Sequence, residues 1–114
     1  MKKSVTLKKN HEFRRLYSKG NTAAGSGLVI YCRKNRLSRN RLGITVSTKI
    51  GHAVVRNRAR RRLREVFRLN SPQLKSGYDI VLVARHRAVN MPWKELNHSF
   101  LRLAEKLNLL LEES

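Results

Sequence analysis

Residues 49–68 read KIGHAVVRNRARRRLREVFR, and this stretch decides how the chain organises itself. On a helical wheel with about 100° between successive residues, its apolar side chains fall on one stripe. The stripe consists of Val55, Ala59, Leu63, Val66 and Phe67. We therefore expect an amphipathic helix from Val54 to Leu69 whose stripe packs against the protein core.

The opposite side of this helix is basic. The wheel places there Asn57, Arg60, Arg61, Arg64 and Arg68, and Glu65 is the only acid among seven arginines. An ordinary solvent-facing helix mixes signs in i,i+4 pairs, whereas like charges at that spacing destabilise a free helix. A polyphosphate would remove the repulsion, and guanidinium groups hydrogen-bond phosphate and stack on bases. The pattern favours RNA over a membrane, since the apolar residues are sized for a protein core.

The whole chain repeats this imbalance. Its 114 residues hold 26 Lys+Arg and 7 Asp+Glu, a net charge of +19, which indicates a polyanionic partner. Residues 1–32, 33–68 and 69–114 carry +6, +12 and +1, so the charge points to one interaction surface. Length predicts a single domain over residues 1–114. The sequence has no apolar run long enough to span a bilayer and no apolar segment typical of a secretory signal. Its single cysteine, Cys32, fits a reducing compartment. We therefore expect a cytoplasmic protein.

Periodicity predicts the remaining elements. They are a helix over Asn10–Lys19, strands over Leu28–Lys34, Arg41–Ser47 and Tyr78–Arg85, and a helix from about Pro92, capped by Asn90, to about Leu111. Residues 21–27 fit either a loop or a weak edge strand. We expect the first two strands to pair as an antiparallel hairpin and the apolar run 80–84 to be a central strand. The result is a mixed α/β fold, an α+β sandwich in the order α-β-β-(β)-α-β-α, with helices covering one sheet face.

The segment Lys49–Arg58, followed by Arg60, Arg61 and Arg64, resembles the Arg-Asn-Arg signature of the bacterial ribonuclease P protein subunit. The resemblance extends over the whole chain, through Glu12-Phe13, Tyr31 and the Tyr78-Asp79 strand, and it departs from the family at His52, where Asn is more usual. It implies a ribosomal S5 domain-2-like fold with a left-handed βαβ crossover, although chain-order rules favour a right-handed one.

The resemblance also implies a function. The holoenzyme removes the 5′ leader of precursor tRNA by metal-assisted hydrolysis, with the RNA subunit as catalyst and magnesium required. The residues expected to contact the RNA subunit are Arg56, Asn57, Arg58, Arg60, Arg61, Arg64 and Arg68. Those expected to contact the leader are Phe13, Tyr17, Tyr31, Arg56 and Asn57. Aromatic faces stack unpaired bases with little sequence demand, as a leader site needs.

Core packing is the alternative for the three aromatic residues, and we expect Trp93 and Phe100 on the closing helix to be core. No catalytic or metal-binding residue is expected in this chain. Its acids are dispersed, its histidines lack ligand spacing, and Cys32 fits a buried strand position.

The expected partners are ribonuclease P RNA and precursor tRNA, with no membrane and no obligatory protein partner. Three other functions share parts of the pattern: a ribosomal or ribosome-assembly protein, a DNA-binding protein, and an autonomous nuclease. The dispersed acids weaken the nuclease alternative.

Overall fold

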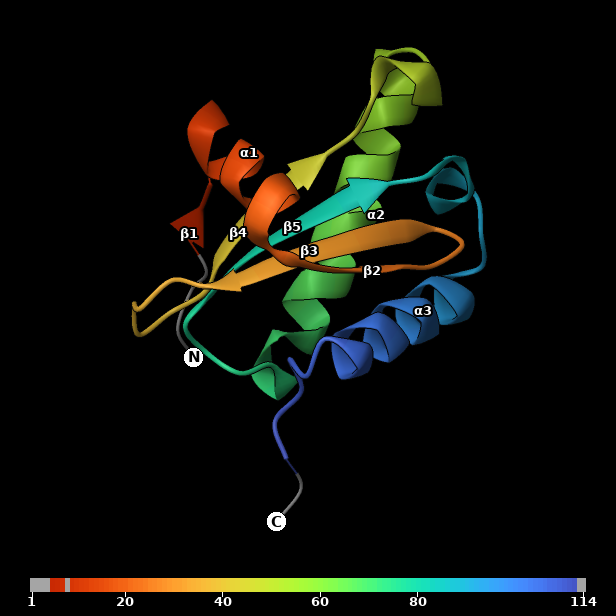
Figure 1. Ribbon diagram of the computed structural model, residues 1–114. Helices are drawn as coiled ribbons and strands as arrows, with labels where there is room; N and C mark the ends of the chain where they lie inside the picture. Colours follow the sequence, from red (N-terminus) through yellow and green to blue (C-terminus); the bar gives the residue numbers. More distant parts are fainter. Residues whose placement is uncertain (1–4, 8, 113–114) are drawn as a thin grey trace.

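The computed structural model describes residues 5–7 and 9–112, which fold around a single five-stranded sheet (Figure 1). The strands are β1 (Val5–Thr6), β2 (Asn21–Ala24), β3 (Leu28–Lys34), β4 (Arg41–Thr45) and β5 (Tyr78–Ala84). The α-helices are α1 (Asn10–Lys19), α2 (Ala53–Asn70) and α3 (Trp93–Lys106), and the 3-10 turns are η1 (Thr48–Ile50), η2 (Ser71–Gln73) and η3 (His86–Val89). The strand order is β1-β4-β5-β3-β2.

The central strand is β5, as its apolar run predicts. It pairs antiparallel with β3 and parallel with β4, so the expected β3–β4 hairpin is wrong. The connection between these strands passes around the beginning of β5. There the backbone N–H of Asn35 donates to the Gly77 carbonyl at 2.9 Å, and the Tyr78 N–H donates to Asn40 Oδ1 at 2.9 Å. A strand that is apolar on both faces is most stable between two neighbours, and β5 takes that place.

The sheet edges are short strands. The sequence left a loop and an edge strand as alternatives for residues 21–27. Residues 21–24 form the strand β2, which pairs antiparallel with β3. At the other edge β1, which periodicity did not predict, pairs parallel with β4.

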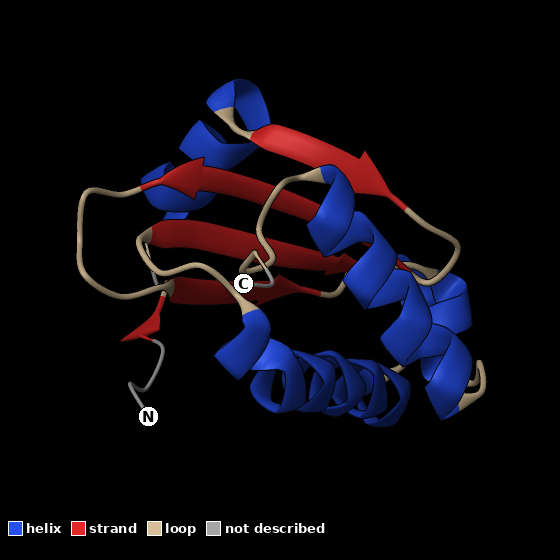
Figure 2. Cartoon of the chain, turned by 90° about the horizontal axis from the view of Figure 1, so that it is seen from below, coloured by secondary structure: helices blue, strands red, loops and turns tan. Residues whose placement is uncertain are grey.

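Helices cover both faces of the sheet, not one. Leu63, Phe100 and the inward side chains Ile80 and Leu82 of β5 form the larger core under α2 and α3. On the opposite face Leu16 of α1 packs on Val81. Successive residues of a strand face opposite ways, so an uninterrupted apolar run requires cover on both sides. Figure 1 shows α1 in front of the sheet and α2 behind it, and Figure 2 shows the same layers from below.

The β4–α2–β5 crossover has the hand that the family resemblance implies. When Figure 1 is turned so that both strands point upward, β5 lies to the right of β4 while α2 passes behind the sheet. This is a left-handed crossover, against the usual right-handed rule.

The closing helix α3 is shorter than expected. It begins after Pro92 rather than at an Asn90 cap and ends at Lys106, because Asn108 adopts a left-handed φ of 58°. Beyond it the Leu111 N–H donates to the Gln73 carbonyl at 2.8 Å. Trp93 lies in the first turn and is 37% exposed, so its assignment to the core is wrong, whereas Phe100 is 1% exposed.

No helix in the described residues is long and apolar enough to span a membrane.

Candidate nucleic-acid interface

The helix α2 separates its side chains as the wheel predicts. Ala59, Leu63, Val66 and Phe67 are buried, and Val55 packs at the edge of the core. On the outer side Val54, Asn57, Arg60, Arg61 and Arg64 line a shallow depression of about 460 Å³, which we call the arginine face. Arg60 Nη1 donates to Asn57 Oδ1 at 3.1 Å. Among the described residues no carboxylate lines this depression, so the face presents only positive and neutral groups to a ligand.

Two arginines at one edge of α2 serve the fold. Arg62 donates to the carbonyls of Ala88, at 2.7 Å, and of Met91. Arg58 Nε donates to the Val89 carbonyl at 2.9 Å. Burial, and then repulsion from Arg58, lowers the pKa of Arg62. These hydrogen bonds connect α2 to η3. Arg58 is one of the expected RNA contacts, and its Nε is already hydrogen-bonded within the protein.

Two other expected RNA contacts also lie outside the depression. Arg68 pairs with Glu65, and its Nε donates to Glu65 Oε1 at 2.8 Å. Arg56 is half-buried, and its Nε has no hydrogen-bond partner within the described chain. His52 occupies the N-cap position of α2, but its side chain makes no capping hydrogen bond. The structure thus brings Asn57, Arg60, Arg61 and Arg64 together and leaves the remaining arginines at the margins.

The three aromatic residues expected at the leader site lie together. The ring centroid of Tyr17 is 6.5 Å from that of Phe13 and 4.9 Å from that of Tyr31. Tyr17 is 41% exposed, while Phe13 and Tyr31 are half-buried. Phe13 packs closely against β4 at Gly43, where a Cβ would stand only 2.6 Å from its ring. Phe13 and Tyr31 are therefore partly packed into the protein, and Tyr17 is the most accessible of the three rings.

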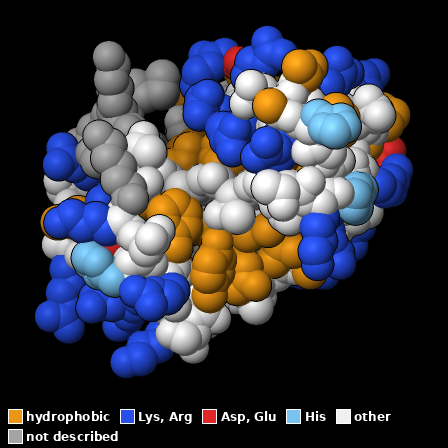
Figure 3. Space-filling model, turned by 90° about the horizontal axis from the view of Figure 1, so that it is seen from above, with side chains coloured by type: hydrophobic (Ala, Val, Ile, Leu, Met, Phe, Trp, Pro, Cys, Tyr) orange, Lys and Arg blue, Asp and Glu red, His pale blue; other side chains and the backbone are white. Residues whose placement is uncertain are grey.

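Beside these rings lies a hollow of about 650 Å³, which we call the aromatic groove. It is lined by Asn10, Phe13, Arg14, Tyr17, Ile44, Thr45, Val46 and Arg60. The Tyr17 hydroxyl is 2.9 Å from Thr45 Oγ1, which fixes the ring against β4. Arg60 lines both the groove and the arginine face, so the two form one continuous surface. In Figure 3 apolar side chains are exposed in the middle of one face, with Lys and Arg side chains around them.

Asn10, Arg14 and Thr45 line the groove without having been predicted. For Asn10 and Arg14 the sequence held a signal, because with Phe13 and Tyr17 they are spaced i, i+3, i+4 and i+7 on one face of α1. Thr45 gave no such signal, since its place beside α1 depends on the order of the strands.

The α1 helix is held in position by an ionic network at its first turn. Arg41 Nη1 donates to Glu12 Oε2 and Arg41 Nη2 to Asp79 Oδ2, both at 2.7 Å. Asn35 Nδ2 adds a bond to Asp79 Oδ1 at 3.0 Å. Hydrogen bonding to Asp79 raises the pKa of Arg41, despite some loss of solvation.

Within the described ranges there is no cluster of three or more His, Cys, Asp or Glu residues that could hold a metal ion.

Known proteins resemble this chain over nearly its whole length. The family model for Ribonuclease P matches residues 1–108. The ribonuclease P protein component of Natranaerobius thermophilus is 44% identical over 96% of both chains, and that of Clostridium kluyveri is 44% identical over 90% of this chain and 94% of its own. Among solved structures, the Staphylococcus aureus RNase P protein is 33% identical with a TM-score of 0.83, covering 96% of this chain and 100% of its own. The Thermotoga maritima RNase P protein is 28% identical with a TM-score of 0.80, covering 95% and 98%.

Proposed function

This chain belongs to the ribonuclease P protein family and is the RNA-binding subunit of ribonuclease P in tRNA 5′ processing; from that premise we propose how its surface is divided between two RNAs. The arginine face docks on ribonuclease P RNA, and the aromatic groove holds the single-stranded 5′ leader of precursor tRNA. Family membership decides for this function over the ribosomal and DNA-binding alternatives.

The observation that carries the proposal is the position of Arg60. It lines both the groove and the arginine face, so a strand leaving the docked RNA can pass directly from one into the other beside this guanidinium. Guanidinium groups bind phosphate oxygens with paired, charge-assisted hydrogen bonds. Stacking on an exposed ring contributes about 1–3 kcal/mol per base whatever the base. A subunit that handles many precursors needs this tolerance of sequence.

We propose that the chain itself supplies no reacting group. A protein-held magnesium ion would need oxygen ligands from clustered carboxylates. The carboxylates of Glu12 and Asp79 are instead bound to Arg41, so these residues do not fit such an ion. The chemistry of hydrolysis is then assigned to the RNA subunit and its magnesium, and the protein binds and orients. We also propose that no further protein is obligatory and that the chain works in the cytoplasm, where the buried thiol of Cys32 stays reduced.

Cleavage of precursor tRNA at low magnesium tests this function. We expect purified protein alone to cleave nothing, and protein plus ribonuclease P RNA to cleave faster than the RNA alone. The products are resolved by gel electrophoresis across a magnesium series. A rate with both components no higher than that of the RNA alone would contradict the proposal, and cleavage by the protein alone would contradict the assignment of catalysis.

A further inference from the structure

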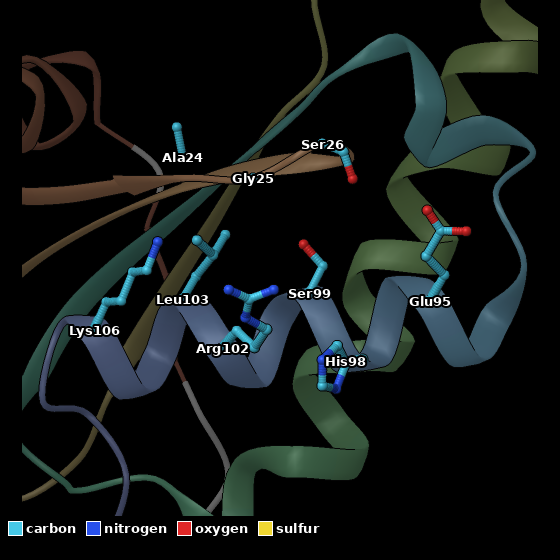
Figure 4. Close-up of a pocket in the computed structure, with 9 residues that line it drawn as sticks. All are labelled: Ala24, Gly25, Ser26, Glu95, His98, Ser99, Arg102, Leu103 and Lys106. Atoms are coloured by element: carbon cyan, nitrogen blue, oxygen red, sulfur yellow. The ribbon is translucent and has the colours of Figure 1, made fainter.

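A third hollow, which is also polar, lies away from the arginine face and the aromatic groove. It is a cleft of about 280 Å³ between α3 and the turn that joins β2 to β3 (Figure 4). Its α3 wall presents Ser99, Arg102 and Lys106, and its other wall is the turn at Gly25 and Ser26. The strand β2 is at the opposite edge of the sheet from β1 and β4, where the aromatic groove lies. The cleft and the aromatic groove therefore lie toward opposite edges of the sheet and share no lining residue.

The cleft offers unused hydrogen-bond donors. Figure 4 shows the side chains of Ser99, Arg102 and Lys106 extending from α3 toward the turn, while His98 points away. Within the described chain, none of those three side chains has a hydrogen-bond or ion-pair partner. Glu95 also lines the cleft, but Arg87 Nη2 neutralises it at 2.7 Å. The cleft therefore keeps two unpaired positive charges in a part of the sequence whose net charge is only +1 over residues 69–114.

The turn that forms one wall of the cleft is held in place by contacts within the fold. The turn approaches α3 so closely that a Cβ at Gly25 would lie 2.7 Å from Ser99 Oγ. Arg85 holds the turn from the other side, donating from Nη1 to the Gly25 carbonyl at 2.7 Å and from its backbone N–H to the Gly27 carbonyl at 3.0 Å. The backbone of the turn is thus already in place, so binding would order only the side chains of Arg102 and Lys106.

We propose that this cleft binds a phosphodiester group of an RNA strand, as a second RNA site on the sheet edge opposite the aromatic groove. The guanidinium of Arg102 and the ammonium of Lys106 match the charge of a phosphate, and the Ser99 hydroxyl adds a neutral donor. The inference rests on the proposed function for the nature of the ligand, since RNA is the polyanion that this protein meets. The strand comes from ribonuclease P RNA or from precursor tRNA, which share this chemistry.

The test uses the full chain with Arg102→Gln and Lys106→Gln, singly and together. Lys94→Gln is the matched control, because Lys94 is exposed on the same helix but does not line the cleft. Binding is measured over a salt series, first to ribonuclease P RNA and then as precursor tRNA to the reconstituted holoenzyme. We expect the double variant to bind one of these RNAs about tenfold more weakly at low salt. Its salt slope should fall by about one, as for a single lost phosphate contact.

The outcomes separate the sources and the alternatives. A loss with ribonuclease P RNA assigns the strand to the RNA subunit, and a loss confined to precursor tRNA assigns it to the substrate. Unchanged affinity and slope for both RNAs, or an equal loss in Lys94→Gln, would overturn the inference. Circular dichroism checks that the variants fold, as expected for side chains without partners. Substitutions of the arginine face in the same assay show whether the proposed function fails independently.

Discussion

At the scale of single residues, the two tyrosines of the aromatic cluster have different surroundings. Tyr17 is on the surface, with its hydroxyl against Thr45, whereas Tyr31 lies half-buried beside Val81 under α1. The two rings pack edge to face, with an interplanar angle of 74°, and only Tyr17 lines the aromatic groove. A base entering the groove therefore meets Tyr17 first, and removal of Tyr31 mixes loss of binding with loss of packing.

Tyr17→Ala should weaken binding of leader-bearing precursor tRNA by about tenfold, since it removes one stacking face. Binding of mature tRNA, which has no leader, should hardly change. Both affinities are measured with the reconstituted holoenzyme. Tyr17→Phe is the control, because it keeps the ring and removes only the hydroxyl, and it should bind precursor nearly as well as the natural chain. Equal losses for precursor and mature tRNA would mean that Tyr17 has a structural role.

At the scale of the element, α2 combines three functions on one helix. Its apolar stripe anchors the larger core, Arg58 and Arg62 hold η3, and the arginine face remains free of acids. The helix can carry these functions together because residues three and four apart share a face while their neighbours point elsewhere. Substitutions one or two positions apart on α2 should therefore have unrelated effects.

Arg60→Ala combined with Arg64→Ala should lower affinity for ribonuclease P RNA and reduce the salt slope of binding by about two. Each guanidinium faces the depression with no carboxylate to neutralise it. The measurement is a filter-binding or fluorescence titration at several salt concentrations, with Lys94→Ala as the control on another helix. A slope equal to that of the natural chain would move the docking surface away from the arginine face.

Arg62→Ala should destabilise the fold by about 1–3 kcal/mol, because it leaves the carbonyls of Ala88 and Met91 without their donor. Arg64→Ala, half a turn further along the helix, should change the free energy of unfolding by less than about 0.5 kcal/mol. Urea unfolding followed by circular dichroism compares the two. Equal stability of the two variants would contradict the structural role of Arg62.

At the scale of the whole molecule, four of the seven acids are paired with arginines, and the surface carries a large excess of basic groups. Glu12 and Asp79 bind Arg41, Glu65 binds Arg68, and Glu95 binds Arg87. The core beneath this surface is apolar on both sides of the sheet, and the thiol of Cys32 is buried in it. Packing, not charge pairing, must therefore supply most of the stability of a chain with a net charge of +19.

Burial raises the pKa of the Cys32 thiol to about 11, from an ordinary value of 9.0. Below about pH 8 the thiol is almost fully protonated in both states and contributes little to the pH dependence. Between about pH 9 and 11 only the unfolded thiol ionises, so stability should fall across this range by about 2–3 kcal/mol. Unfolding of the natural chain and of Cys32→Ala should be compared from pH 8 to pH 10.5. A difference between them that stays constant with pH would contradict the prediction.

The sequence by itself determined the features that depend on neighbours along the chain. Helical periodicity placed α1 at residues 10–19 and separated the buried stripe of α2 from its arginines. The apolar run 80–84 identified the central strand, and alternation placed Leu42, Ile44 and Val46 toward the core. These patterns are local because a side chain's direction follows from backbone geometry over a few residues.

Only the tertiary structure decided which distant segments meet. Pairing of β3 and β4 with β5, in place of a hairpin, cannot be read from either strand, since any strand has two edges that can accept a partner. The same strand order brings Thr45 to Tyr17, and it sets the cleft at α3 on the far edge from the groove. Where η3 packs also decides which arginines of α2 stay free to bind RNA and which, like Arg58 and Arg62, hydrogen-bond to η3 and the residues after it. Such contacts arise from burying both faces of β5 at once, a requirement of the whole molecule that no local pattern contains.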